Sequence, residues 1–169
     1  MHMNITLNDI KRTVNKLASK IDAPKDSIPT FGYSKDFGYP HIEIDENNFY
    51  YVIMERGQIL EKKATNNIDT LLYWIFDSVT FRMAVAFDLS NRIETEDCRR
   101  IIFRRQEELL GILNENWQKD KENYHMKVLE KNPFDDNAGL RATLCGKLRK
   151  EGYSEKEIEN IAYEKYPLN

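Results

Sequence analysis

Apolar residues recur at helical spacing near the start of the chain. Four of them fall on one face of a helix, at intervals of three and four residues: Ile10, Val14, Leu17 and Ile21. Thr6 suits the N-cap position, and Asp9 brings negative charge into the first turn. Pro24 and Pro29 then predict the end of this helix.

Residues 39–65, "YPHIEIDENNFYYVIMERGQILEKKAT", alternate between apolar and polar positions and predict three antiparallel strands. Two-residue turns are expected at Asn47–Asn48 and Arg56–Gly57. This register pairs Ile44 with Tyr51 and Ile42 with Ile53. It gives one apolar face, made of Ile42, Ile44, Phe49, Tyr51, Ile53 and Leu60. The other face collects His41, Glu43, Asp45, Tyr50, Val52, Met54, Ile59 and Glu61.

The rest of the chain predicts helices. Residues 67–90 are apolar on most sides, as in a central helix. A further helix is expected to begin at Thr95, and Asn114 is expected to end it and to cap the next one, over residues 115–131. A short helical pair follows, with Gly152 just past the end of its first member and a capping box of Ser154 and Glu157 in its second.

The predicted fold class is therefore α+β, with a small three-stranded antiparallel meander packed on a mainly helical body. We expect a main domain over residues 1–132. Residues 133–169 form the C-terminal helical pair, which we expect to dock on that domain.

Composition limits the class of protein. A chain of 169 residues buries roughly 70% of the surface of its unfolded form, enough for a core of its own. A net charge of −3 argues against a general nucleic-acid or membrane binder. The N-terminus lacks an apolar signal core, and Asp77 and Arg82 interrupt the most apolar run. We expect a cytoplasmic protein in which Cys98 and Cys145 are free, buried thiols.

Motifs for metal binding or catalysis are missing from the sequence. His2, His41 and His125 lie in different elements without ligand spacing, and the two cysteines form no CxxC pair. The chain has no GxSxG motif, and no GxGxxG or GK[ST] sequence that would hold a phosphate. We expect no metal, no cofactor and no catalytic residue.

The polar face of the meander leaves two interpretations open. Glu43 and Asp45 point to the same side, beside Tyr50, and paired carboxylates can serve acid–base chemistry if their environment separates their pKa values. Nothing in the sequence supplies such an environment, and a solvated outer face accounts for both residues. The face is nevertheless more apolar than solvation requires, which indicates a covering element or a partner.

The run "CRRIIFRRQEE" raises a nucleic-acid interpretation. On a helix, Arg100 and Arg104 share a face, while Arg99 and Arg105 point elsewhere. The four arginines of the Arg99–Arg105 helix therefore form no single patch, and a solvated, ion-paired helix is the simpler interpretation.

Four stretches together resemble the immunity protein 63 family of bacterial polymorphic toxin systems. They are "FGYPHIEIDENNFYYVIMERG", "IDTLLYWIFDSVTFRMA", "FRRQEELLGILNENW" and "NPFDDNAGLRATLCGKLRKEGYSEKEIENIAYEKYP". The resemblance runs from about Phe31 to Pro167. The most family-like residues are Tyr39, Pro40, His41, Glu43, Asp45, Glu55, Arg56, Gly57, Tyr73, Trp74, Arg104, Gln106 and Leu110.

This resemblance implies a small, non-catalytic cytoplasmic protein that binds a cognate toxin domain and occludes its active site. The expected contact residues are His41, Glu43, Asp45 and Tyr50 on the sheet, with Tyr33, Phe37 and Tyr39 from the adjoining loop. Two alternatives stay open. One is a small enzyme centred on His41 and Glu43, and the other is a nucleic-acid adaptor that uses the Arg99–Arg105 helix.

Overall fold

The first helix begins at the predicted N-cap Thr6, which forms a capping box with Asp9. The Thr6 side chain accepts the backbone N–H of Asp9, and the Asp9 carboxylate accepts the backbone N–H of Thr6. Helix α1 then runs over Leu7–Lys20, and a short 3₁₀ turn follows at Lys25–Ser27. The computed structural model describes residues 5–168, so His2, weighed above as a metal ligand, lies outside them.

The sheet has four strands rather than the three expected. They are β1 (Thr30–Phe31), β2 (Tyr39–Ile44), β3 (Phe49–Glu55) and β4 (Gln58–Thr65), in the order β1-β2-β3-β4. The last three form the predicted antiparallel meander, whereas β1 pairs with β2 in parallel. The α+β class is confirmed, and the sheet is mixed rather than purely antiparallel.

The predicted register of β2 against β3 is wrong by two residues. Ile44 pairs with Phe49 and Ile42 with Tyr51. The cause is the position of the turn, which is centred on Glu46–Asn47, one residue earlier than expected. Asp45 N–H donates to the Asn48 carbonyl at 3.0 Å, and Asp45 Oδ1 accepts the backbone N–H groups of Asn47 and Asn48, both at 2.8 Å. A shift of two residues leaves every side chain on its predicted face.

The second turn is as predicted. Glu55 pairs with Gln58, and both intervening residues have positive φ, 52° at Arg56 and 73° at Gly57. An irregularity between Ile53 and Met54 shifts the pairing with β4. As a result Leu60, which was expected on the apolar face, is 61% exposed.

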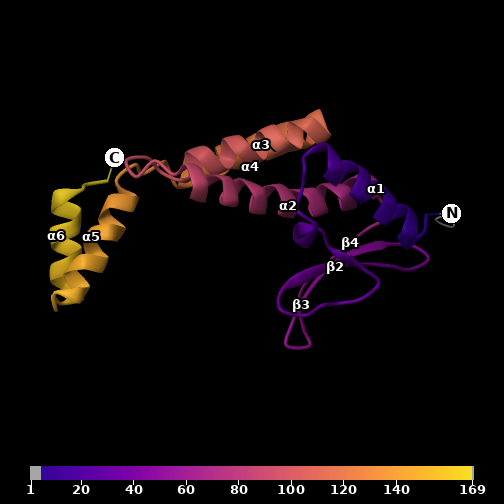
Figure 1. Cartoon of the computed structure of the whole chain (residues 1–169), viewed down its shortest axis with the longest axis horizontal. Coiled ribbons are helices and arrows are strands. Elements are labelled where there is room, and N and C mark those ends of the chain that lie inside the picture. The colour runs from indigo at the N-terminus through magenta and orange to yellow at the C-terminus, as the bar shows by residue number, and fades with distance from the viewer. Residues whose placement is uncertain (1–4, 169) are drawn as a thin grey trace. The chain divides into compact units, whose positions relative to one another are not determined.

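The chain forms two compact units, and the first holds the sheet. It contains the residues up to Met83 together with Glu108–Gln118. Its core joins the apolar sheet face to α1 and to α2 (Ile68–Asn91), which lie beside the sheet in Figure 1. The fully buried side chains of this core are Ile10, Val14, Ile42, Phe49, Leu71, Ile75, Phe76, Val79, Leu109 and Leu110.

Helix α2 has the length and composition of a membrane span. Its side chains Leu71, Ile75 and Phe76 are buried in the core of the first unit, and this packing accounts for the apolar composition of its first half. In its second half the apolar side chains Phe81, Phe87 and Leu89 are exposed. The predicted central helix is thus confirmed, and Asn67 caps it by accepting the N–H groups of Asp69 and Thr70.

Helices α3 (Arg99–Leu113) and α4 (Glu115–Lys131) run side by side in Figure 1. The boundary at Asn114 is confirmed, because its side chain accepts the N–H of Asn116. The expected start at Thr95 is wrong. Asp97 rather than Thr95 accepts the first free N–H group, that of Arg99, and the helix begins four residues later than expected.

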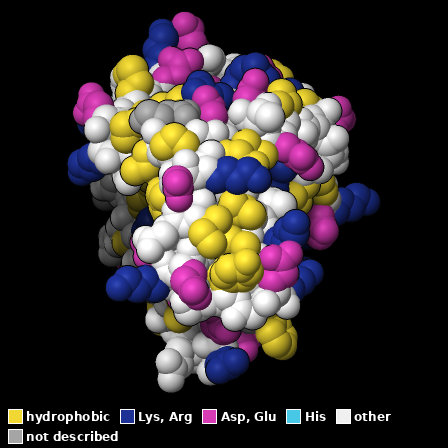
Figure 2. Space-filling model, turned by 90° about the vertical axis from the view of Figure 1, so that its left-hand side faces the viewer, with side chains coloured by type: hydrophobic (Ala, Val, Ile, Leu, Met, Phe, Trp, Pro, Cys, Tyr) yellow, Lys and Arg dark blue, Asp and Glu magenta, His cyan; other side chains and the backbone are white. Residues whose placement is uncertain are grey.

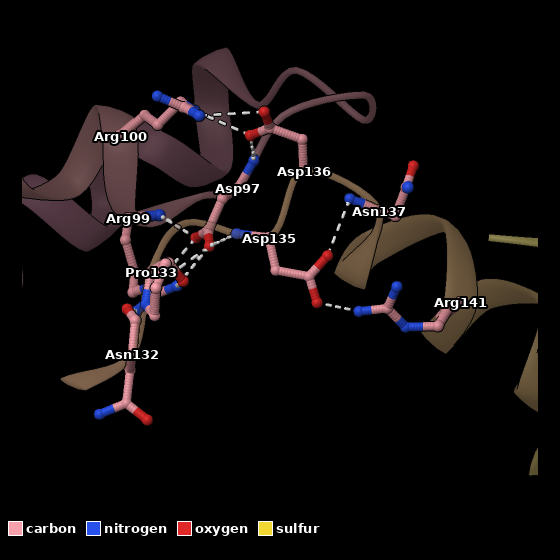
Figure 3. A network of polar contacts seen from close by, with 9 residues as sticks. All are labelled: Asp97, Arg99, Arg100, Asn132, Pro133, Asp135, Asp136, Asn137 and Arg141. Carbon is pink, nitrogen blue, oxygen red and sulfur yellow. Dashed lines mark hydrogen bonds and ion pairs between the residues drawn. The ribbon is translucent and has the colours of Figure 1, made fainter. Parts of the chain in front are cut away.

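A network of aspartates and arginines holds the second unit, which comprises Ala84–Glu107 and the chain from Lys119 onward. Figure 3 shows this network, here named the aspartate clasp: Asp97, Arg99, Arg100, Asp135, Asp136 and Arg141. The Asp97 carboxylate accepts a hydrogen bond from the backbone N–H of Asp135 at 2.9 Å. The backbone N–H of Asp97 donates to the Asp136 carboxylate, also at 2.9 Å. The turn before α3 is thereby fastened to the segment before α5 (Ala138–Lys150).

The C-terminal helical pair consists of α5 and α6 (Glu155–Lys165), which lie side by side in Figure 1. Gly152 takes a φ of 89° after α5, and Tyr153 N–H returns to the Leu148 carbonyl, so the predicted C-terminal glycine is confirmed. The capping box of Ser154 and Glu157 is confirmed as well. The expected domain boundary near residue 132 stays a prediction.

Candidate functional site

The outer face of the sheet carries a chain of paired charges. Glu43 lies between two partners: its Oε1 is 3.0 Å from His41 Nε2, and its Oε2 is 3.0 Å from Lys62 Nζ. The strand pairing brings them together, since His41 is opposite Val52, which in turn is opposite Lys62. Because Glu43 stands two residues from His41 on β2, both point to the same side.

Tyr50 extends this cluster toward the β2–β3 turn. It pairs with Glu43 across the strands, and its hydroxyl donates to Asp45 Oδ2 at 2.5 Å. Lys62 Nζ lies 4.4 Å from the centre of the Tyr50 ring, within the range of a cation–π contact. We name these five residues, His41, Glu43, Asp45, Tyr50 and Lys62, the Glu43 cluster.

Lys62 is the member that sequence reasoning missed. Alternation from the predicted turn places Lys62 on the apolar face, beside Leu60. The shift of pairing between Ile53 and Met54 instead sets Lys62 opposite Val52, on the face of Glu43. Three of the expected contact residues, Glu43, Asp45 and Tyr50, thus hold defined positions on one face, with a lysine between them.

Electrostatics keep both carboxylates of the cluster ionised. The hydrogen bond from Lys62 holds the pKa of Glu43 below its ordinary value, with a smaller contribution from His41. The Tyr50 hydroxyl and the N–H groups of Asn47 and Asn48 lower the pKa of Asp45. The two pKa values move in the same direction, whereas an acid–base pair requires them to move apart.

His41 is buried, with only 2% of its surface exposed. The imidazole is therefore out of reach of a partner protein and of a substrate. Its Nδ1 has no hydrogen-bond partner within residues 5–168. His41 therefore supports Glu43 from beneath, and a toxin would meet Glu43 rather than the imidazole. For the same reason a substrate would lack access to the centre on which the enzyme alternative depends.

The loop before β2 holds the other three expected contact residues in different environments. Phe37 is 88% exposed and Tyr33 is 59% exposed. Tyr39 is only partly exposed, because its hydroxyl donates to the carbonyls of Asp26 and Ile28. Lys35 and Arg82 lie over its ring, at 4.6 and 5.7 Å. Tyr39 therefore fastens the loop, while Phe37 and Tyr33 face solvent.

Three of the four arginines of α3 have partners in the second unit, whereas Arg104 is exposed. Arg99 donates two hydrogen bonds, from Nε and Nη2, to the Asp97 carboxylate, and Arg100 donates from the same two atoms to Asp136. The Arg105 guanidinium lies 5.1 Å from the centre of the Phe87 ring. Figure 2 looks onto the end formed by α5 and α6, where Lys and Arg are likewise interspersed with Asp and Glu rather than gathered. Arg99 and Arg100, neutralised by Asp97 and Asp136, offer a nucleic-acid backbone little free charge.

Possible metal ligands and thiols are dispersed over the described residues. Within residues 5–168, no group of three or more His, Cys, Asp or Glu side chains is placed to hold a metal ion. The cysteines are unpaired, as expected, but neither is buried: Cys98, which precedes α3, is exposed, and Cys145 on α5 is half-buried.

The comparisons with known proteins point to one family. A family model described as Immunity protein 63 matches residues 45–127, about half of the chain. This match confirms the resemblance over a narrower range than the one expected from the sequence. No curated protein and no solved structure matches the chain.

Proposed function

Because residues 45–127 place this chain in the immunity protein 63 family, we propose that it binds a bacterial toxin domain and blocks the toxin's active site. The toxin is one made by the same bacterium or by a sibling. The family match is the observation that carries this proposal. We propose further that the protein acts in the cytoplasm, and that it acts by binding rather than by catalysis.

The Glu43 cluster supports this role because it is a prearranged surface. Glu43 and Asp45 are each held by two or more hydrogen bonds, so little side-chain freedom is lost when a partner docks. Tyr50 adds a flat, amphipathic ring of the kind that is enriched at energetically important interface positions. Such a surface can bind a protein without any reacting group.

The charge of this surface indicates the chemistry of the partner. Three acidic residues, Glu43, Asp45 and Glu46, lie within four positions of β2 and its turn, and Lys62 is paired with Glu43 among them. A basic patch beside the toxin's active cleft would complement this acidic edge and speed association. A cleft that binds phosphates has that character, so the proposed target is a toxin with a positively charged cleft.

Growth rescue tests the function directly. This chain is expressed in cells together with the toxin domain encoded beside its gene, and survival is counted with and without induction of the toxin. We expect the wild-type chain to restore growth. Absence of both rescue and a stable complex would contradict the proposal.

A double variant tests the surface. Tyr50→Ala with Glu43→Lys removes the ring and inverts the charge that Lys62 and His41 hold. The matched control, Tyr163→Ala with Glu159→Lys, makes the same changes at exposed residues of α6. We expect the sheet variant to lose rescue and the control to keep it, with both folded by circular dichroism. Equal rescue by the two variants would move the interface away from the Glu43 cluster.

A further inference from the structure

The loop between β1 and β2 presents an aromatic side chain to solvent. Phe37 is 88% exposed, more than any other large hydrophobic residue described. Its backbone, and that of Asp36 before it, lies in the left-handed region, with φ values of 55° and 61°. That conformation is unfavourable for residues with a Cβ, and most of all for bulky ones.

Hydrogen bonds hold this loop in place despite the strain. Asp36 Oδ1 accepts the backbone N–H of Gly57 from the β3–β4 turn at 3.3 Å, and Gly38 N–H donates to the Met54 carbonyl at 2.8 Å. Ser34 Oγ accepts the N–H of Asp36 at 2.9 Å. These contacts use Asp36 and the backbone on either side of Phe37, but none uses the Phe37 ring.

An unfavourable backbone that displays an unused aromatic ring is typical of a binding position rather than of a packing one. A core phenylalanine would repay the strain by burial, and this ring has almost none. A glycine or an asparagine would fit the same backbone at lower cost. The side chain at this position is therefore explained by a partner.

The acidic edge described above lies at the opposite end of the same strand. Phe37 stands two residues before β2, and Asp45 follows directly after it. The six residues of β2 span about 20 Å. A standard interface of about 800 Å² on each partner is roughly 30 Å across. One partner can thus cover both the acidic edge and Phe37.

We propose that Phe37 is the aromatic anchor of the toxin interface, and that the bound toxin domain offers an apolar pocket about one strand length from a basic patch. This inference rests on the proposed function. The acidic edge of Glu43, Asp45 and Glu46 orients the basic patch of the toxin, and Phe37 fills the toxin's apolar pocket. The rigid, strained loop holds the ring ready before the toxin arrives.

Phe37→Asn separates binding from folding. Asparagine tolerates positive φ, so we expect the melting temperature of the full-length variant to stay level or to rise by about 1–3 °C. Loss of the ring should weaken binding to the purified toxin domain at least about tenfold, measured by calorimetry or surface plasmon resonance. Leu89→Ala is the control: Leu89 is 65% exposed on α2, and its truncation should leave the affinity unchanged.

The outcomes distinguish the two proposals. Wild type that fails to bind the toxin domain overturns the proposed function, and this inference falls with it. Wild type that binds, with Phe37→Asn binding equally well, overturns the anchor alone. A variant that binds weakly but also melts several degrees lower identifies Phe37 as a structural residue and again overturns the anchor. Weak binding at an unchanged or higher melting temperature supports it.

Discussion

The carboxylate of Asp97 accepts the backbone N–H of Asp135, 38 residues further along the chain, at 2.9 Å. The same carboxylate accepts the backbone N–H and the guanidinium of Arg99. Burial by itself would raise the pKa of Asp97, but the hydrogen bonds from Arg99 hold it below its ordinary value. One ionised, buried side chain thus joins two distant loops of the second unit.

Asp97→Asn should destabilise the protein by about 1–3 kcal/mol, because an amide cannot accept all of these donors and leaves the Arg99 guanidinium without its charge partner. Urea unfolding followed by circular dichroism measures the change. Glu96→Gln, at the exposed neighbouring position, serves as the control and should change stability by less than about 0.5 kcal/mol. Equal midpoints for the two variants would show that the clasp contributes little.

Acid should weaken the clasp within a defined range of pH. The hydrogen bonds from Arg100 lower the pKa of Asp136 from 3.8 to about 2. Since the folded value is the lower one, the stabilisation is complete above about pH 4 and is lost as the pH falls toward 2.

The difference between wild type and Asp136→Asn isolates this contribution, because the Asp9 carboxylate of the α1 cap, whose pKa is also about 2, titrates in both proteins. We expect the urea midpoints of the two proteins to converge between about pH 4 and pH 2. A constant difference down to pH 2 would contradict the assigned role of Asp136.

The β3–β4 turn offers a pair of substitutions with opposite signs. Arg56 and Gly57 both have positive φ, and Asn-Gly is the favoured sequence for such a turn. Arg56→Asn should therefore raise the free energy of unfolding by a few tenths of a kcal/mol, and Gly57→Ala should lower it by about 1–2 kcal/mol. Thermal unfolding of both variants checks the prediction. A stabilised Gly57→Ala variant would exclude this turn geometry.

Trp117 should anchor the core of the first unit. It is 3% exposed, its ring stacks on Phe76 with centroids 6.1 Å apart, and its indole N–H donates to Asp69 at 3.2 Å. Trp117→Ala should cost about 3–5 kcal/mol through the cavity that it leaves. Trp117→Phe keeps the stacking and should cost much less, because the exposed Asp69 carboxylate can turn to water. Similar losses for the two variants, measured by urea unfolding, would assign the stabilisation to the hydrogen bond instead.

The faces of the sheet could be predicted from the sequence, but the ends of its strands could not. Alternation places Ile42, Phe49 and Tyr51 on the core side in both the expected and the observed register, because a shift of two residues preserves the faces. The position of the turn depends on the Asp45 side chain, which accepts the N–H groups of Asn47 and Asn48. Strand β1, with two residues, is too short to show a period.

Site residues were harder to place, because exposure depends on neighbours that are distant in the sequence. His41 falls on the expected face and is nevertheless buried. Lys62 could be assigned to the Glu43 cluster only once the shift in the pairing of β3 with β4 was known. Phe37 is predicted as a contact residue of the loop before β2. Its left-handed backbone could not be predicted, since it depends on contacts of the loop with the β3–β4 turn.

The bonds of Arg141 have a consequence for protein turnover. This buried guanidinium contacts Asp135 and donates to the carbonyls of Tyr166 and Pro167, and Asn137 adds a further bond to Pro167. The segment that follows α6 is thereby fastened to the start of α5, and a fastened segment is a poor substrate for proteases, which cleave locally unfolded backbone. Arg141→Ala should therefore shorten the half-life of the protein in the cell, measured by chase after translation is stopped. Under the proposed function, the lifetime of the protein limits how long it can neutralise a toxin, so these few bonds would help to set the duration of the protection.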